Sequence, residues 1–81
     1  MAELTTNELR AEFERMFGTR PSVSTGDRLS RVLHDVDQTV VDNELMYVRL
    51  QLSRATGDQA QNLRLNLEAK IRVARACGYK A

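Results

Sequence analysis

The spacing of apolar residues in the second half of the chain constrains its fold more than any other feature. Between residues 41 and 55 they recur alternately four and three positions apart, at Val41, Leu45, Val48, Leu52 and Ala55. This spacing lines one side of an α-helix and makes a seam for a second helix. Residues 60–74 again show helical spacing, at Ala60, Leu63, Leu67, Ile71 and Ala74. Because Gly57 and Asp58 form a short turn between them, we expect an antiparallel helical hairpin.

The first half of the chain carries the start and stop signals of two shorter helices. Thr5 and Glu8 have the spacing of a capping box, and Gly18 is suited to end that helix. Its apolar stripe consists of Leu9, Phe13, Met16 and Phe17. Ser24 or Thr25 is predicted to cap the next helix, whose apolar face carries Leu29, Val32, Leu33 and Val36. The polar run 37–39 is predicted to end it, with Asp37 or Thr39 capping the helix that follows.

These boundaries predict an all-α fold of four helices, at about 5–17, 25–37, 39–56 and 58–77. We expect a single domain over 1–81, a small helical bundle made of an N-terminal helix-loop-helix (5–37) and a C-terminal helical hairpin (39–77). Chains this small often need disulfides, a metal or a partner for stability. Cys77 is the only cysteine and His34 the only histidine, so an internal disulfide is impossible and zinc ligands are too few. Good helix packing or association with a partner remains as the source of stability.

Apolar residues also occur away from the predicted seam. The last helix has a second apolar arc, at Leu65, Ala69, Val73, Ala76 and Cys77, and helix 39–56 has Met46 and Leu50 outside its seam. A two-helix hairpin buries one stripe per helix, so these residues need another cover. The cover is either the first two helices, a second copy of the chain, or another protein. In the last two cases the predicted partner interface is Met46, Leu50, Leu65, Ala69 and Val73.

No arrangement of residues predicts catalysis. His34 and Asp35 are adjacent, and neighbours on a helix point about 100° apart, so Asp35 is badly placed to orient the imidazole. Cys77 lies at the C-terminal end of a helix, the end that does not lower a thiol pKa. No glycine-rich phosphate loop is present. We therefore predict that the chain is not an enzyme and has no catalytic residues, cofactor or metal site.

The charge is divided between the two halves of the chain. Residues 1–44 hold 5 Arg against 9 Asp and Glu, a charge of −4, and residues 45–81 hold 7 Lys and Arg against 2 Asp and Glu, a charge of +5. Basic residues late in the last helix either complement its dipole or contact phosphate or an acidic protein. Loop 19–28 at a helix start either caps that helix or holds a phosphate. The residues predicted for nucleic-acid contact are Arg28, Arg31, Arg64, Arg72 and Arg75.

Residues 4–33 resemble a SAP-type helix–extended loop–helix motif. The resemblance lies in the run from Leu4 to Arg10, followed by Phe13, Pro21, Gly26, Leu29 and Leu33. Residues 9–21 also resemble a family of uncharacterised bacterial and phage proteins. SAP motifs bind DNA, which by resemblance would place Arg10, Arg28 and Arg31 near phosphate. The chain departs from the motif in its longer loop, in Gly26 or Asp27 where a basic residue is usual, and in its acid-rich first helix.

No apolar run reaches the ~20 residues of a membrane span, and the first residues lack the basic and apolar parts of a signal peptide. We expect a cytoplasmic protein without membrane contact. The favoured function is that of a small non-enzymatic regulator, adaptor or inhibitor acting through helical protein–protein contacts. We expect a homodimer with an unidentified protein partner, suited to a phage or mobile element. The alternative is a DNA-binding regulator that uses residues 19–31 or the basic strip of the last helix.

Overall fold

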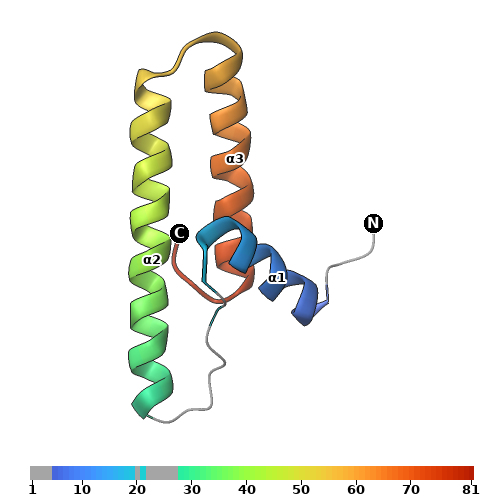
Figure 1. Cartoon of the computed structure of the whole chain (residues 1–81), viewed down its shortest axis with the longest axis vertical. Helices are drawn as coiled ribbons and strands as arrows, with labels where there is room; N and C mark the ends of the chain where they lie inside the picture. The colour runs from blue at the N-terminus through green and yellow to red at the C-terminus, as the bar shows by residue number, and fades with distance from the viewer. Residues whose placement is uncertain (1–4, 20, 22–27) are drawn as a thin grey trace.

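The computed structural model describes residues 5–19, 21 and 28–81, with side chains from residue 31 onward in the last range. In this part of the chain the fold is all-helical: α1 (Thr6–Phe17), α2 (Arg28–Arg54) and α3 (Gly57–Ala76). Helices α2 and α3 form a long antiparallel hairpin, and α1 lies across it away from the α2–α3 turn (Figure 1). None of the described helices is long and apolar enough to cross a membrane.

The predicted seam of the hairpin is confirmed. Val41, Leu45 and Val48 of α2 are at most 2% exposed, and Ala74 of α3 is fully buried. Leu67 and Ile71 pack against this core as half-buried residues. Inside the hairpin, the buried Lys70 ammonium donates a hydrogen bond of 2.5 Å to the Glu44 carboxylate, which joins α3 to α2 by an ion pair.

The number of helices was predicted wrongly. The described part of the chain has three helices where four were expected, because α2 runs without a break through residues 37–39 and joins the predicted helices 25–37 and 39–56. No Gly or Pro interrupts this stretch, and its polar side chains find partners that are compatible with a helix. Thr39 Oγ1 donates to the Asp35 carbonyl oxygen one turn back, and the Asp37 carboxylate accepts from the Tyr79 hydroxyl. Neither residue is a cap.

The boundaries of α1 agree with the sequence prediction. The Glu8 backbone N–H donates to Thr5 Oγ1, and the Thr5 N–H donates to the Glu8 carboxylate, which completes the capping box. Gly18 ends the helix with φ 77°, a conformation that suits glycine. The predicted caps Ser24 and Thr25 lie outside the described residues, as does most of the loop in the SAP-like pattern.

The turn between α2 and α3 differs in detail from the prediction. Gly57 has φ 60° and is the first residue of α3, whereas Thr56 is the N-cap and makes no side-chain cap hydrogen bond. Asp58, which was expected in the turn between the two helices, lies in the first turn of α3. Its carboxylate still faces the positive end of the helix dipole, which is favourable there.

The residues after α3 fold back between the helices and complete the core. Tyr79 is 4% exposed and stacks between Phe13 of α1, at 5.2 Å between ring centroids, and His34 of α2, at 4.6 Å. Phe17 extends the stack beyond Phe13. Four rings from α1, α2 and the C-terminal segment therefore hold the bundle together, although Tyr79 lies beyond the last helix that the sequence predicted, at 58–77.

The start of α2 does not pack as the sequence predicted. Val32, Leu33 and Val36 were expected on the buried face of a separate second helix, and all three are exposed large apolar residues. Since helix 28–54 is continuous, its phase is fixed by the seam at Val41 and Leu45, and that phase turns Val32 and Val36 outward. α1 packs mainly on α3, so nothing in the described structure covers them.

Candidate protein-binding surface

The most distinctive surface of the described chain is the outer face of α2, opposite the seam. Four large apolar residues are more than half exposed there: Val32 at 53%, Val36 at 55%, Met46 at 57% and Leu50 at 53%. With the exposed Thr39 and Asn43 between them, they recur at intervals of four, three, four, three and four residues. We call this set the outer stripe: Val32, Val36, Thr39, Asn43, Met46 and Leu50.

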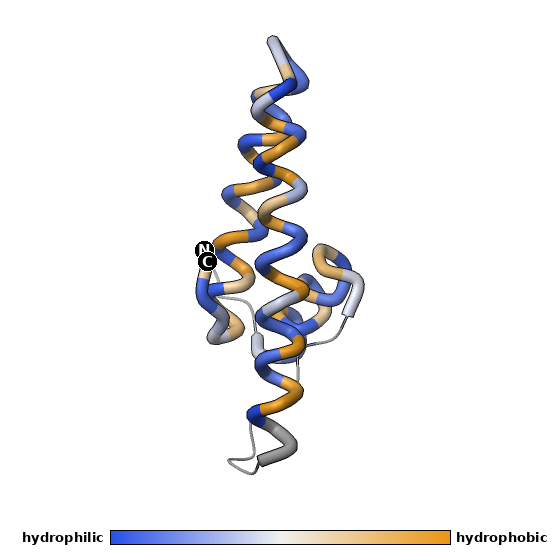
Figure 2. Tube along the Cα trace, turned by 90° about the vertical axis from the view of Figure 1, so that its left-hand side faces the viewer, coloured by the Kyte–Doolittle hydropathy of each residue, from blue (hydrophilic) through white to orange (hydrophobic). Residues whose placement is uncertain are grey.

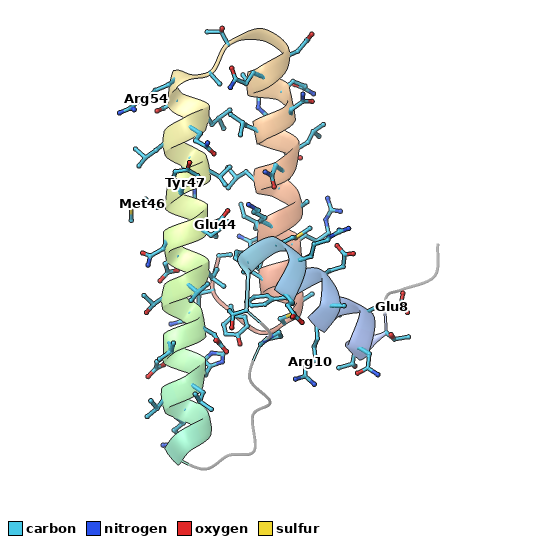
Figure 3. All side chains as sticks on the ribbon, in the orientation of Figure 1. Glu8, Arg10, Glu44, Met46, Tyr47 and Arg54 are labelled. Atoms are coloured by element: carbon cyan, nitrogen blue, oxygen red, sulfur yellow. The ribbon has the colours of Figure 1, made fainter. Side chains whose placement is uncertain are left out.

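The outer stripe points away from the rest of the molecule. Figure 3 shows Met46 pointing away from α3, while Glu44 points toward α3 and its partner Lys70. Figure 2 looks onto the α2 side and shows hydrophobic segments recurring along that helix. A four-three repeat of this kind is the pattern that another helix packs against in a coiled coil.

The two edges of the outer stripe differ in chemistry. One edge is apolar and contains the exposed Leu33 and Tyr47, with the half-buried Val40, which also packs against the core, between them at intervals of seven residues. The other edge is charged and contains Asp35, Asp42 and Arg49, also seven residues apart. Asp35 and Arg49 are both exposed, and their side chains form no ion pair with another described residue. In coiled coils, the side chains that flank the apolar seam determine which helices pair and in which orientation.

The C-terminal segment lies along the charged edge. Gln38 holds it, donating to the Lys80 carbonyl oxygen and accepting from the Lys80 N–H, both at 2.8 Å. The segment and α2 together line an open groove formed by Asp42, Leu45, Met46, Arg49, Leu50, Ser53, Lys80 and Ala81. Met46 and Leu50 therefore belong both to this groove and to the outer stripe, and both remain more than half exposed.

The predicted partner interface is divided by the structure. Met46, Leu50 and Leu65 are exposed, whereas Val73 is buried in the core and Ala69 is half-buried. Val73 was therefore wrongly predicted as a free interface residue, because α1 covers that part of α3. Ala69 and Val73 line a hollow of about 610 Å³ between α1 and α3. The residues around this hollow are Leu9, Glu12, Met16, Ala69, Arg72, Val73 and Ala76.

The predicted nucleic-acid residues are not brought into one patch. Arg31 is exposed near the start of α2, and Arg64 is exposed in the first half of α3, the helix that begins at the opposite end of the hairpin (Figure 1). Arg72 lines the hollow beside α1, and Arg75 donates two hydrogen bonds to the Ala81 carbonyl oxygen. The Arg28 side chain lies outside the described residues. Lys70, a further basic residue of α3, is buried against Glu44.

The two residues singled out for possible chemistry have structural surroundings. His34 is half-buried and stacks on Tyr79 with an interplanar angle of 13°. The Cys77 thiol is 3.9 Å from the Leu9 carbonyl oxygen and is half-buried. Burial raises the pKa of the Cys77 thiol, and the positive charge of Arg10 only partly offsets this. A thiol with a raised pKa is a poor nucleophile at neutral pH.

The sequence analysis missed Val32 and Val36 as members of the candidate surface. The signal was present: the four-three interval continues backward from Leu50 and Met46 through Asn43 and Thr39 to Val36. It was hidden by the predicted break at residues 37–39, which assigned the two halves of the stripe to different helices.

The chain matches no protein-family model, no curated protein and no solved structure. Within the described residues, no group of three or more His, Cys, Asp or Glu side chains is arranged to hold a metal ion. The candidate surface therefore rests on the geometry of α2 and on the chemistry of its exposed side chains.

Proposed function

We propose that this chain is a small, non-enzymatic, cytoplasmic regulator, adaptor or inhibitor that acts through helical protein–protein contacts. Its binding surface in this proposal is the outer stripe of α2 together with the apolar edge at Leu33, Val40 and Tyr47. The main support is that apolar residues repeat at coiled-coil spacing along the exposed side of one helix. Large apolar side chains that gather along one exposed helix face mark interaction sites, whereas single exposed apolar residues are ordinary.

The way in which α2 is held also favours a binding role. The outer stripe belongs to a single helix whose opposite side is locked by the Val41, Leu45 and Val48 seam and by the Lys70–Glu44 ion pair. A surface built on a rigid helix loses little conformational entropy when a partner binds, so more of the contact energy appears as affinity.

A photo-crosslinking amino acid at position 47 tests this proposal in the cell from which the chain comes. Tyr47 is exposed at the edge of the outer stripe, so we expect a covalent adduct with a protein partner after irradiation. The mass of the adduct distinguishes a second copy of the chain from another protein. The same amino acid at the exposed position 62 of α3 is the control and should give little adduct. Absence of any adduct at positions 36, 47 and 50 would contradict the proposal.

A second candidate function is DNA binding, which one observation favours. Arg64, Arg72 and Arg75 lie along one strip of α3 at helical spacing. Glu68 and Glu12 lie on or beside this strip, and Arg75 is engaged by Ala81, so fewer cations remain for phosphate. Binding to a random-sequence duplex across a salt series tests this function. Affinity that falls steeply with salt, and weakens in Arg64→Ala, would support it, and no binding at low salt would exclude it.

A further inference from the structure

We propose that the outer stripe of α2 packs antiparallel against the outer stripe of a second copy of the same chain, which gives a two-fold symmetric dimer. The inference rests on the proposed function, since it names the occupant of the same surface. The support comes from the self-complementary order of residues along α2. Antiparallel helices bring the first part of one stripe against the last part of the other.

In one antiparallel register every residue of the outer stripe lies opposite a residue of the same polarity in the second copy. Each large apolar side chain lies opposite a large apolar side chain of the second copy, and the two polar residues lie opposite each other. Three pairs, each formed twice, describe the contact: Val32 with Leu50, Val36 with Met46, and Thr39 with Asn43. The two symmetry-related Thr39–Asn43 pairs at the centre of the seam fix the register, because any shift would place their hydroxyl and amide groups against hydrocarbon.

Both edges of the stripe fit this register. On the charged edge, the exposed Asp35 carboxylate comes beside the exposed Arg49 guanidinium of the second copy, and symmetry repeats the pair. On the apolar edge, Leu33 comes beside Tyr47 of the second copy, and Val40 comes beside its own copy at the two-fold axis. Opposite charges and apolar groups are thus each matched, which selects the partner orientation.

A parallel arrangement of the same stripes is disfavoured by the edges. Parallel helices pair one edge with the other, which would place Arg49 beside Arg54 of the second copy and Asp42 beside Tyr47. The first contact is a like-charge repulsion, and the second places a carboxylate against an apolar ring. The charged edge therefore favours the antiparallel arrangement over the parallel one. Its side chains form no ion pair within the described part of one chain.

One contact in the proposed dimer opposes association. Asp42 lies on the charged edge near the two-fold axis, where it approaches its own copy. It accepts a hydrogen bond from Gln38 and shares a groove with Lys80, whose charge reduces the repulsion. We therefore expect Asp42→Asn to strengthen the dimer about threefold at low salt, in line with the modest worth of exposed charge pairs.

The length of the stripe sets the strength of the dimer. Val32 to Leu50 covers about 27 Å of helix at 1.5 Å per residue. One helix from each chain gives an interface near the small end of stable complexes, which bury roughly 1,200 Å² or more. We expect a dissociation constant in the micromolar range, so that the chain exchanges between monomer and dimer as its concentration changes.

Single cysteines test both the partner and the orientation. In a Cys77→Ser background, Val40→Cys should crosslink to itself through a short bis-maleimide. Leu33→Cys and Tyr47→Cys should crosslink efficiently only when the two chains are mixed. Leu65→Cys, on the exposed side of α3, is the matched control and should stay monomeric. Crosslinking of the Tyr47→Cys chain with itself alone, at the yield of the mixture, would contradict the antiparallel arrangement.

A charge exchange tests the register. Asp35→Arg alone and Arg49→Asp alone should each weaken the dimer about tenfold in sedimentation equilibrium, because two ion pairs become repulsive. The chain that carries both substitutions should recover most of the affinity, since the pair is re-formed with its charges exchanged. Independent weakening by the two substitutions, without recovery, would overturn the proposed register. Circular dichroism of each variant checks that the helices remain intact.

The failure of this inference is distinguishable from the failure of the proposed function. A chain that stays monomeric up to millimolar concentration, with native circular dichroism, overturns the dimer. If the photo-crosslinker at position 47 then traps a different protein, the proposed function stands with another occupant. If it traps nothing, both fall.

Discussion

Individual polar groups decide how the core of this small bundle is completed. The Tyr79 ring is buried between Phe13 and His34, and its hydroxyl donates a 3.0 Å hydrogen bond to the Asp37 carboxylate. An aromatic residue with a polar tip can therefore fill the space between three segments and still satisfy a buried acid. The sequence analysis had treated Asp37 as a candidate helix cap and assigned no role to Tyr79.

Removing this hydroxyl should destabilise the protein. Tyr79→Phe keeps the ring stack and takes one donor from a carboxylate that is 6% exposed, so we expect a loss of about 1–3 kcal/mol in the free energy of unfolding. Urea unfolding followed by circular dichroism measures this value. Tyr47→Phe is the matched control, because Tyr47 is exposed and its hydroxyl only accepts a weak bond from Gln51. Equal stability of the two variants would show that the Asp37 contact is unimportant.

The Cys77 thiol should titrate above its ordinary range, because burial raises its pKa. We expect the pH midpoint of alkylation by iodoacetamide to be higher in the folded chain than in urea. Arg10→Ala should raise it further, since a nearby positive charge is lost, whereas Arg15→Ala should not. Because the folded pKa is the higher one, the thiol's contribution to stability is complete at neutral pH and declines as pH rises through the folded pKa. A folded midpoint below that of the unfolded chain would be incompatible with this environment.

At the scale of the elements, the continuity of α2 has the largest consequences. A break at residues 37–39 would allow Val32 and Val36 to turn toward a core of their own. Without the break, their direction is fixed by their spacing from the buried seam residues of the same helix. They therefore face outward, in line with Met46 and Leu50. The choice between an inner and an outer position for these residues therefore depends on three residues in the middle of a helix.

Thr39→Ala distinguishes a continuous helix from a capped break. Thr39 is exposed and bonds back to the Asp35 carbonyl oxygen, so in mid-helix alanine should be neutral or stabilising by up to about 0.7 kcal/mol. At a helix N-cap the same change would cost about 1 kcal/mol. Urea unfolding at concentrations where the chain is monomeric gives the sign. A clear loss of stability, with non-helical Cα chemical shifts at residues 37–39, would favour two helices.

At the scale of the whole molecule, the two sides of α2 differ in how far other segments cover them. The aromatic stack, α1 and the C-terminal segment enclose one part of the hairpin, while the outer stripe has no cover among the described residues. The hairpin gives the molecule its length, with principal extents of 46 × 30 × 17 Å. A chain of this size with an uncovered apolar helix face gains stability by association.

Thermal unfolding should therefore depend on concentration. We expect the Tm to rise with protein concentration across the micromolar range, because a partner that binds only the folded state stabilises it by mass action. Met46→Glu combined with Leu50→Glu should remove this dependence and leave the helical circular dichroism unchanged at low concentration. Leu65→Glu, on the exposed side of α3, is the control and should keep the dependence. A Tm independent of concentration in the unsubstituted chain would indicate a monomer.

Local signals in the sequence determined much of this protein. The capping box at Thr5 and Glu8, the glycine after α1 and the four-three seam of the hairpin are set by short-range geometry, so they were predictable from neighbouring residues. The exposure of Met46, Leu50 and Leu65 followed from the same helical phase. The tertiary structure alone decided whether residues 37–39 end a helix, because the Tyr79 hydroxyl and the Lys80 backbone that bind Asp37 and Gln38 lie about forty positions away. It also decided that Val73 is covered and that Val32 and Val36 are not, since burial depends on which segments meet in space.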